Sequence, residues 1–244
     1  MSDLATQAQV AIVTGAGSGI GAAIARDLGA RGTNLVLVGR RAELLDERVA
    51  EIMAGGGSAL ASPGDVREFA DLERAASVAL DHWGRIDVLV ANAAIADFGP
   101  IAEADPELWR DVIVTNVLGV MYAVRAVLPH MLGAGSGHVV ITASGSGRVT
   151  YVGEPAYVAS KHATVAFADC LRLEVAAAGI RVSVIEPGLV ETPLIHVYEG
   201  SNDMVGEVDA LTPEDIARAV RYVLDQPPGV NVFEVLVRPT RQLL

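Results

Sequence analysis

The sequence predicts an α/β fold in which a mostly parallel sheet of about seven strands carries helices on both faces. Short runs of Val, Ile and Leu alternate along the chain with longer stretches of helical periodicity. A continuous apolar run indicates a strand buried on both faces, as parallel strands are. The 244 residues show neither an internal repeat nor a low-complexity linker, so we expect one domain over residues 1–244.

Each element has its own local signal. The run AQVAIVTG (8–15) is rich in strand-forming residues, and the segment 19–32 has a helical period and ends in glycine. The alternation then continues with strands at 33–39, 58–66, 85–94, 137–144, 180–188 and 231–237, and with helices at 41–57, 67–83, 107–132, 155–178 and 212–226.

Several of these boundaries are marked by proline or by a capping residue. Pro155 opens one helix, and Thr212 is the expected N-cap of the last helix, with Pro213 in its first turn. Pro187 stops the strand at 180–188. The segment 189–211 is the one long irregular stretch, and such a loop inside a compact domain is usually functional. We therefore interpret it as a substrate loop.

Composition excludes several classes of function. A net charge of −12 argues against nucleic acid as a partner, because phosphate binding needs a basic surface. The single cysteine, Cys170, can form neither an internal disulfide nor a cysteine-based metal site, and we expect no metal. The N-terminus lacks a basic patch followed by an apolar run, and Asn116 and Arg125 interrupt the apolar stretch 112–132. We expect a cytoplasmic protein without a signal peptide or membrane span.

A glycine-rich turn, TGAGSGIG (14–21), joins the first strand to the first helix. Glycines at 15, 19 and 21 let a pyrophosphate approach the main chain, and the helix N-terminus supplies free N–H groups and a positive dipole end. The strand–turn–helix context favours a dinucleotide site over a turn that is merely tight. The expected contacts of this turn are Gly15, Ser18, Gly19, Ile20 and Gly21.

The end of the second strand indicates which dinucleotide binds. A site for NAD places an acid there for the ribose 2′-hydroxyl, but this chain has Gly39 followed by Arg40 and Arg41. A guanidinium binds phosphate through paired hydrogen bonds, so we predict NADP(H), with NAD(H) as the alternative and Arg40 as the better candidate. The competing interpretation is that the arginines only solvate the start of the next helix.

Four polar residues form the candidate catalytic group. Tyr157 and Lys161 lie four positions apart on one helix face, where an ammonium would lower the pKa of a phenol toward neutrality. Ser144 ends the strand at 137–144, at the edge where substrates bind a parallel sheet. Asn116 lies within an apolar helix. Taken singly, the Tyr–Lys pair also fits a solvated helix face, and Asn116 also fits a satisfied core amide.

Together, the turn TG-x3-G-x-G and the residues Asn116, Ser144, Tyr157 and Lys161 resemble the short-chain dehydrogenase/reductase family over about 8–238. The resemblance implies a Rossmann-type doubly wound fold, a tetramer or dimer built on the helices at 107–132 and 155–178, and a nicotinamide cofactor. It implies proton exchange by Tyr157, ribose binding by Lys161, substrate polarisation by Ser144, and a water held by the helix backbone at Asn116. It also implies cofactor contacts from Asp65, Val66, Asn92, Ala93, Pro187, Gly188, Val190 and Thr192.

One family position departs from the pattern. The family's Asn-Ala-Gly motif continues here with Ala94 in place of its glycine, and Asn92 by itself also fits an ordinary turn.

The substrate is predicted only by class. The tail VNVFEVLVRPTRQ resembles a subgroup that acts on small hydroxy acids and amino alcohols with NADP, which favours a small polar alcohol or carbonyl. A carrier-bound 3-oxoacyl thioester and a non-catalytic dinucleotide sensor are the alternatives. The expected substrate wall comprises the loop 189–211 with residues near Ser144 and Asp97, and its candidates are Glu154, His196, Tyr198, Glu199, Asp203 and Met204. Ser146 is a rival to Ser144 for the substrate oxygen, but the family's spacing selects Ser144.

Overall fold

The computed structural model describes residues 8–195 and 209–242, and its centre is one parallel sheet of seven strands. The strand order is β3-β2-β1-β4-β5-β6-β7, which confirms the predicted fold class. The strands are β1 (Val10–Thr14), β2 (Asn34–Gly39), β3 (Ser58–Pro63), β4 (Val88–Ala91), β5 (Gly137–Thr142), β6 (Ile180–Pro187) and β7 (Glu234–Val237).

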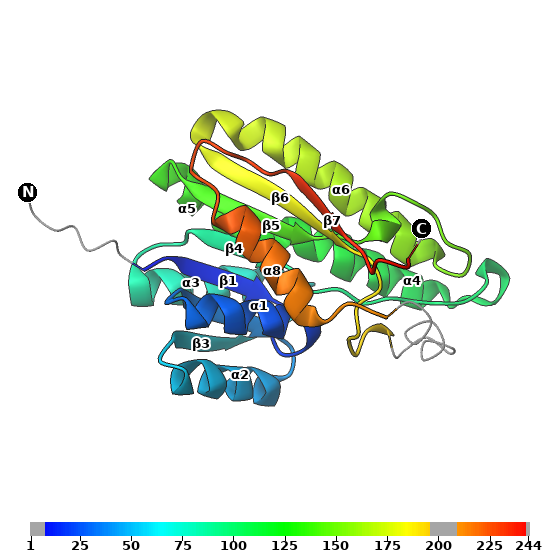
Figure 1. The fold of residues 1–244 in the computed structure, drawn as a ribbon, viewed down its shortest axis with the longest axis horizontal. Coiled ribbons are helices and arrows are strands. Elements are labelled where there is room, and N and C mark those ends of the chain that lie inside the picture. The colour runs from blue at the N-terminus through cyan, green and yellow to red at the C-terminus, as the bar shows by residue number, and fades with distance from the viewer. Residues whose placement is uncertain (1–7, 196–208, 243–244) are drawn as a thin grey trace, which may run out of the picture.

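Helices cover both faces of the sheet (Figure 1). One face packs against α1 (Gly19–Ala30), α2 (Ala42–Ala54) and α8 (Pro213–Leu224), and the other against α3 (Phe69–Trp83), α5 (Gly119–Ala134) and α6 (Pro155–Val175). Each interface buries its own apolar cluster, because strands between two helical layers have apolar side chains on both faces. Short pieces at α4 (Pro106–Ile113), η1 (Ile101–Glu103), η3 (Gly145–Gly147) and η4 (Ala176–Ala178) complete the helical elements.

The strand order reverses direction between β1 and β4. From β1 the chain adds β2 and β3 on one side, and then crosses to add β4 to β7 on the other. The helices after β1 and β4 therefore diverge and leave a crevice at the carboxyl ends of these strands, where open α/β sheets bind ligands. The turn at 14–21 and the ends of β4, β5 and β6 all lie at this edge.

The predicted helix at 107–132 is interrupted by a π-helical turn. The segment η2 (Val114–Leu118) joins α4 to α5, and the Gly119 N–H donates to the carbonyl of Val114, five residues earlier. Over Pro106–Ala134 the chain is long and apolar enough to cross a membrane by length and composition, but 56% of its most apolar window is buried inside the protein. This burial fits the predicted core helix.

Two predicted strands begin later in the structure than expected, and near each start a side chain bonds to the main chain of a neighbouring strand. Asn231 bonds the N–H and the carbonyl of Val182 through its side chain, both at 2.8 Å, and regular pairing in β7 begins at Glu234. In the same way, the Asp87 carboxylate accepts from the Val10 N–H at 2.8 Å just before β4 begins. In both places, a side chain makes hydrogen bonds with main-chain groups of the neighbouring strand.

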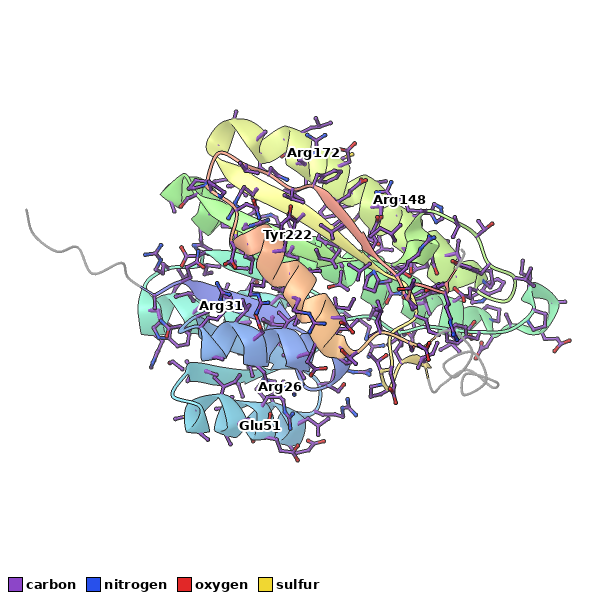
Figure 2. The ribbon with its side chains drawn as sticks, viewed as in Figure 1. Arg26, Arg31, Glu51, Arg148, Arg172 and Tyr222 are labelled. Atoms are coloured by element: carbon purple, nitrogen blue, oxygen red, sulfur yellow. The ribbon has the colours of Figure 1, made fainter. Side chains whose placement is uncertain are left out.

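Ion pairs connect the three helices of the α1 face at the surface (Figure 2). Arg26 of α1 contacts Glu214 of α8 at 3.0 Å and Glu51 of α2 at 3.9 Å. Arg31, just after α1, contacts Asp225 after α8 at 2.7 Å. These side chains are well exposed, so each pair contributes at most about 1 kcal/mol and mainly fixes the relative orientation of the helices.

A buried histidine makes stability sensitive to acid. His138 is 2% exposed, and its Nε2 lies 2.8 Å from the Ser183 hydroxyl, which donates to the carbonyl of Val232. Nε2 is therefore the protonated nitrogen, and Nδ1 is buried without a partner among the described residues. Burial, with a smaller effect from the charge of Arg181, lowers the pKa of His138 to about 3.

We predict that the free energy of unfolding falls as pH drops from about 6.5 toward 3. In this window the unfolded chain binds a proton on His138 that the folded chain does not, which costs up to about 1.4 kcal/mol per pH unit. Urea denaturation at several pH values measures the slope. In the His138→Gln variant, whose amide can also donate to Ser183, the slope should be flatter. Equal slopes in the two proteins would contradict the assignment.

Candidate active site

The glycine-rich turn is built by close backbone packing. Gly15 has a φ of +68°, and a Cβ there would lie 2.9 Å from the Cα of Ala93. A Cβ on Gly21 would collide with the carbonyl oxygen of Gly15 and lie 2.7 Å from the Asn92 amide nitrogen. Glycine is therefore required at both positions because the main chain folds against itself and against the end of β4. The turn leaves the first N–H groups of α1 facing the crevice.

Asn92 and Thr14 join the ends of two neighbouring strands. The Thr14 hydroxyl accepts from the N–H groups of Asn92 and Ala93 at 3.0 and 3.1 Å. The Asn92 amide in turn donates to the Thr14 carbonyl at 3.1 Å. Both predicted residues of this segment line the crevice, as does Ala94, where the family pattern has glycine.

The two arginines after β2 lie at the same end of the crevice as the glycine-rich turn. Arg40 and Arg41 are exposed, and both line the cavity. Arg41 donates to the Ser18 hydroxyl at 3.2 Å and so connects the end of β2 to the glycine turn. This bond makes Arg41 a candidate equal to Arg40, whereas the sequence favoured Arg40 from its position.

Asp65 follows β3 as predicted and lines the cavity, but its carboxylate is already paired. It accepts from Arg67 Nη2 at 2.7 Å and from Arg67 Nε at 2.9 Å. Partial burial raises the pKa of Asp65, yet the bonds and charge of Arg67, with a contribution from Arg40, lower it overall. Asp65 is therefore an ionised group at the end of the crevice that Arg40 and Arg41 occupy.

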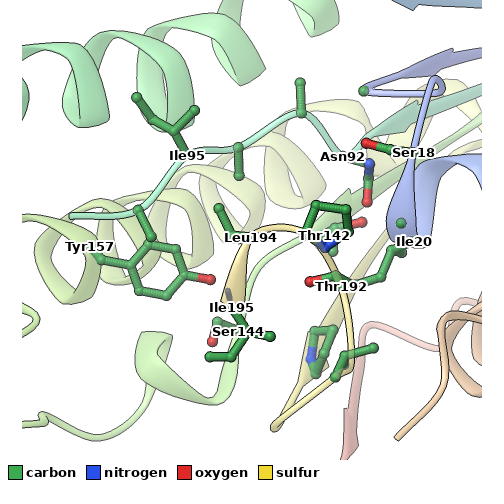
Figure 3. Close-up of a pocket in the computed structure, with 18 of the residues that line it drawn as sticks. Ser18, Ile20, Asn92, Ile95, Thr142, Ser144, Tyr157, Thr192, Leu194 and Ile195 are labelled. Carbon is green, nitrogen blue, oxygen red and sulfur yellow. The ribbon is translucent and has the colours of Figure 1, made fainter. Parts of the chain in front are cut away.

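Tyr157 and Ser144 meet at the opposite end of the same crevice. Tyr157 lies in the first turn of α6, Ser144 follows β5, and the phenol oxygen points toward the serine (Figure 3). The Ser144 hydroxyl accepts from the N–H of Ser146 at 3.1 Å, which fixes its position. The ring of Phe98 lies 6.5 Å from the ring of Tyr157 and forms part of the wall.

Lys161 is buried one turn further along α6. Its side chain lies with Nζ 5.5 Å from the centroid of the Tyr157 ring and donates to the Thr142 carbonyl at 3.0 Å. Burial lowers the pKa of Lys161 to about 8. A lysine ammonium has three N–H bonds, and the described residues engage one of them.

The pKa of Tyr157 differs from the sequence-based expectation. Burial raises it to about 12, a hydrogen bond with Ser144 opposes this, and the charge of Glu154 raises it further. We expected Lys161 to lower this pKa, but in this structure the ammonium is directed to the Thr142 carbonyl, and burial dominates. The phenol is therefore protonated at neutral pH, which is the state that an acid catalyst needs.

Asn116 connects the segment at Ile95 to α6, the helix that carries Tyr157 and Lys161. Its side chain accepts from the Ile95 N–H at 2.9 Å and donates to the Ile95 carbonyl at 2.8 Å and to the Ser160 hydroxyl at 3.0 Å. Ser160 donates to the carbonyl of Tyr157 at 2.7 Å. The amide is thus fully used inside the protein, and its residue lies in the π-helical turn, a feature frequent at functional sites. Sequence periodicity could not reveal that turn.

One cavity of about 760 Å³ connects these groups. Two predicted residues, Gly21 and Asn116, do not line it. The predicted residues that do are Gly15, Ser18, Gly19, Ile20, Arg40, Arg41, Asp65, Val66, Asn92, Ala93, Ser144, Ser146, Glu154, Tyr157, Lys161, Pro187, Gly188, Val190 and Thr192. The volume is within the range of about 300–1,000 Å³ that is typical of ligand sites.

The structure adds lining residues that the sequence did not indicate. Tyr151, Arg241 and Gln242 line the cavity beside Phe98. The tail reaches it because β7 pairs with β6, and the Gln242 side chain accepts from the Leu189 N–H at 2.9 Å. The tail at Gln242 and the segment at Leu189 are far apart in the chain, so local sequence patterns do not predict this contact.

The predicted substrate loop is anchored at both of its ends. Val190 bridges to Leu211, and the Glu191 N–H donates to the Leu211 carbonyl at 2.9 Å. Residues 192–195 line the cavity. The remaining loop candidates, His196, Tyr198, Glu199, Asp203 and Met204, lie outside the described residues.

Comparisons with known proteins agree with the resemblance in the sequence. Residues 9–202 match the short chain dehydrogenase family. An uncharacterised oxidoreductase of Staphylococcus saprophyticus is 40% identical over 235 residues, which are 96% of this chain and 98% of that protein.

Two solved structures extend the likeness to the fold. An alcohol dehydrogenase from the archaeon Thermococcus sibiricus, complexed with 5-hydroxy-NADP, has a TM-score of 0.88 and 31% identity over 96% of this chain and 97% of its own. Actinorhodin polyketide ketoreductase with NADPH has a TM-score of 0.89 and 34% identity over 97% and 98%. This chain belongs to the short-chain dehydrogenase/reductase family and is an oxidoreductase.

Proposed function

We propose that this chain, acting as one domain, transfers a hydride between NADP(H) and a small polar alcohol or carbonyl compound. The observation that carries the proposal is that Tyr157 and Ser144 share one cavity with the glycine turn and with Arg40 and Arg41. A dinucleotide and a small substrate can therefore occupy one continuous space. The NADP-bound relatives support this cofactor choice.

The lining groups fit such a cofactor. The glycine turn lines the cavity at the N-terminus of α1, which suits a pyrophosphate, and Arg40 and Arg41 supply cations for a 2′-phosphate. The N–H bonds of Lys161 that Thr142 does not use can donate to ribose hydroxyls. When bound, the nicotinamide supplies the hydride acceptor or donor.

The protein supplies orientation and proton transfer. In reduction, Tyr157 donates its phenolic proton to the carbonyl oxygen, and in oxidation the phenolate form accepts the proton of the alcohol. The Ser144 hydroxyl binds the same oxygen and polarises it. Asn116 positions Tyr157 through Ser160. From the family resemblance, we expect the helix backbone at Asn116 to hold a water on the path from Lys161 to solvent.

A screen of small alcohols and carbonyls, followed by the absorbance of the reduced cofactor, tests the proposal. NADPH and NADH are compared in parallel. We expect turnover of at least one small polar compound, with NADPH preferred. The absence of turnover across the panel with either cofactor would reject the proposal and favour a non-catalytic dinucleotide sensor.

Reduction of a carrier-bound 3-oxoacyl thioester is the second candidate, and the 34% identity to a polyketide ketoreductase favours it. Against it stands the net charge of −12, because an acidic carrier protein needs a basic docking surface. A short 3-oxoacyl thioester in the same screen separates the two candidates, since the small-substrate proposal predicts lower kcat/KM for it than for the small carbonyls.

We also propose that the protein is a cytoplasmic homo-oligomer, a tetramer or a dimer. The helices α4, α5 and α6 expose large apolar side chains at Leu108, Ile113, Leu132 and Leu173, which suit an interface between copies. Size-exclusion chromatography with light scattering at several concentrations should give a mass of two or four chains. A persistent monomer would reject the oligomer.

A further inference from the structure

The end of the cavity at Tyr157 and Ser144, here called the substrate end, contains an acidic group that has no role in the proposed reaction. Glu154 lies immediately before α6, three residues before Tyr157, and lines the cavity. Its charge raises the pKa of both Tyr151 and Tyr157, which places the carboxylate close to the reacting position.

The Glu154 carboxylate has few hydrogen-bond partners among the described residues. It accepts one hydrogen bond among the described residues, from the Ser146 hydroxyl at 3.1 Å, although a carboxylate has about four acceptor sites. It precedes a helix but makes no side-chain cap to it. Burial raises the pKa of Glu154, and the hydrogen bond from Ser146 opposes this.

The half-buried Glu154 carboxylate keeps acceptor sites that no described residue fills. A ligand in the cavity can bring hydrogen-bond donors to these sites. The cavity also has a guanidinium at its rim, Arg241, but that side chain is 71% exposed and lies 3.6 Å from Asp209. Water and Asp209 therefore screen the charge of Arg241.

Two other cations lie near this end. The Lys161 ammonium lies 5.5 Å from the centroid of the Tyr157 ring and is bonded to the Thr142 carbonyl. Burial raises the pKa of Tyr151, and the charge of the second cation, Arg238, opposes this. Glu154 is the acidic group that lines the cavity beside Tyr157 and still has open acceptor sites.

We propose that Glu154 is a specificity-determining residue. It selects substrates that carry an ammonium group on the carbon adjacent to the reacting carbon, and it disfavours substrates that carry a carboxylate at that position. This inference rests on the proposed function and narrows its substrate class to amino alcohols and amino ketones. The ammonium donates to the Glu154 carboxylate while Ser144 and Tyr157 hold the substrate oxygen. In oxidation, the alcohol carbon loses a hydride to NADP⁺ and its hydroxyl proton goes to the phenolate form of Tyr157, which leaves a ketone, NADPH and the neutral phenol.

Three probes with the same skeleton test the inference: 1-amino-2-propanol, 1,2-propanediol and 3-hydroxybutyrate. They place an ammonium, a hydroxyl or a carboxylate at the same distance from a secondary alcohol. A charge-assisted hydrogen bond is stronger than a neutral one, so kcat/KM with NADP⁺ should be about 10- to 100-fold higher for the amine than for the diol, and lowest for the acid.

The Glu154→Gln variant keeps the shape and the contact with Ser146 but removes the charge. We expect it to lose most of the preference for the amine. Glu107→Gln, on the exposed surface of α4, is the matched control and should keep the wild-type order. Retention of the amine preference in Glu154→Gln, or a wild-type preference for 3-hydroxybutyrate, would overturn the inference.

Calorimetric binding separates this inference from the proposed function. The three probes are titrated into the NADP⁺-loaded Tyr157→Phe protein, which is expected to bind but not to react. Tightest binding of the amine, lost on adding Glu154→Gln, supports the inference even if the wild-type protein turns over none of the probes. Turnover of the probes without that order of binding supports the proposed function and rejects the inference. Failure of all three to bind also rejects it.

Discussion

Replacement of Tyr157 by Phe is expected to lower kcat by at least about 10²–10⁴-fold, the usual contribution of a positioned acid–base group. The phenol oxygen points toward Ser144 at the substrate end of the cavity, and phenylalanine keeps the ring and its contact with Phe98. Steady-state kinetics on the best substrate of the screen measure the change.

Binding of NADPH is the internal control for this variant. The glycine turn and the two arginines lie at the opposite end of the cavity from the phenol oxygen, so the Kd for NADPH, from fluorescence titration, should change by less than about threefold, a shift below 1 kcal/mol. Wild-type turnover in Tyr157→Phe would remove Tyr157 from the mechanism. Loss of both turnover and cofactor binding would indicate a structural defect in place of a chemical one.

The double replacement of Arg40 and Arg41 by Ala is expected to raise KM for NADPH by about 10- to 100-fold and to leave KM for NADH nearly unchanged. The reason is that a charged hydrogen bond contributes about 1.5–3 kcal/mol, and only NADPH has a 2′-phosphate to receive one. The bond from Arg41 to Ser18 shows that this side chain already lies across the turn that would hold the cofactor.

The two single variants rank the arginines. The sequence favoured Arg40, and the structure gives Arg41 an equal position. Arg110→Ala, an exposed arginine on α4, is the control for the loss of positive charge alone. An equal rise in KM for both cofactors would contradict a phosphate contact and would support the view that the arginines only solvate the start of α2.

Much of the fold follows from local sequence. Continuous apolar runs predicted a mostly parallel sheet with strands buried on both faces, and the seven parallel strands confirm the sheet. The inner strands β1, β2, β4, β5 and β6 are buried as expected, whereas the edge strands β3 and β7 are partly exposed. The capping signal at Thr212 was also sufficient, because the hydroxyl accepts from the Asp215 N–H and the Asp215 carboxylate accepts from the Thr212 N–H. These features depend on residues that are close together in the chain.

The features that escaped prediction depend on distant contacts. The π turn at Asn116 is stabilised by bonds to Ile95 and Ser160, which are far away in sequence. The approach of Gln242 to the cavity requires β7 to pair with β6. The high pKa of Tyr157 follows from burial and from Glu154, and helix spacing alone suggested the opposite direction.

The crystal structure of the complex with NADP⁺ and a slowly reacting alcohol tests the central claim most directly. We predict the substrate oxygen within about 2.6–3.2 Å of the Tyr157 phenol and the Ser144 hydroxyl. The nicotinamide should lie against the same substrate carbon, and the 2′-phosphate should contact Arg40 or Arg41. A nicotinamide ring placed away from Tyr157, or a substrate oxygen bound by other groups, would contradict the account.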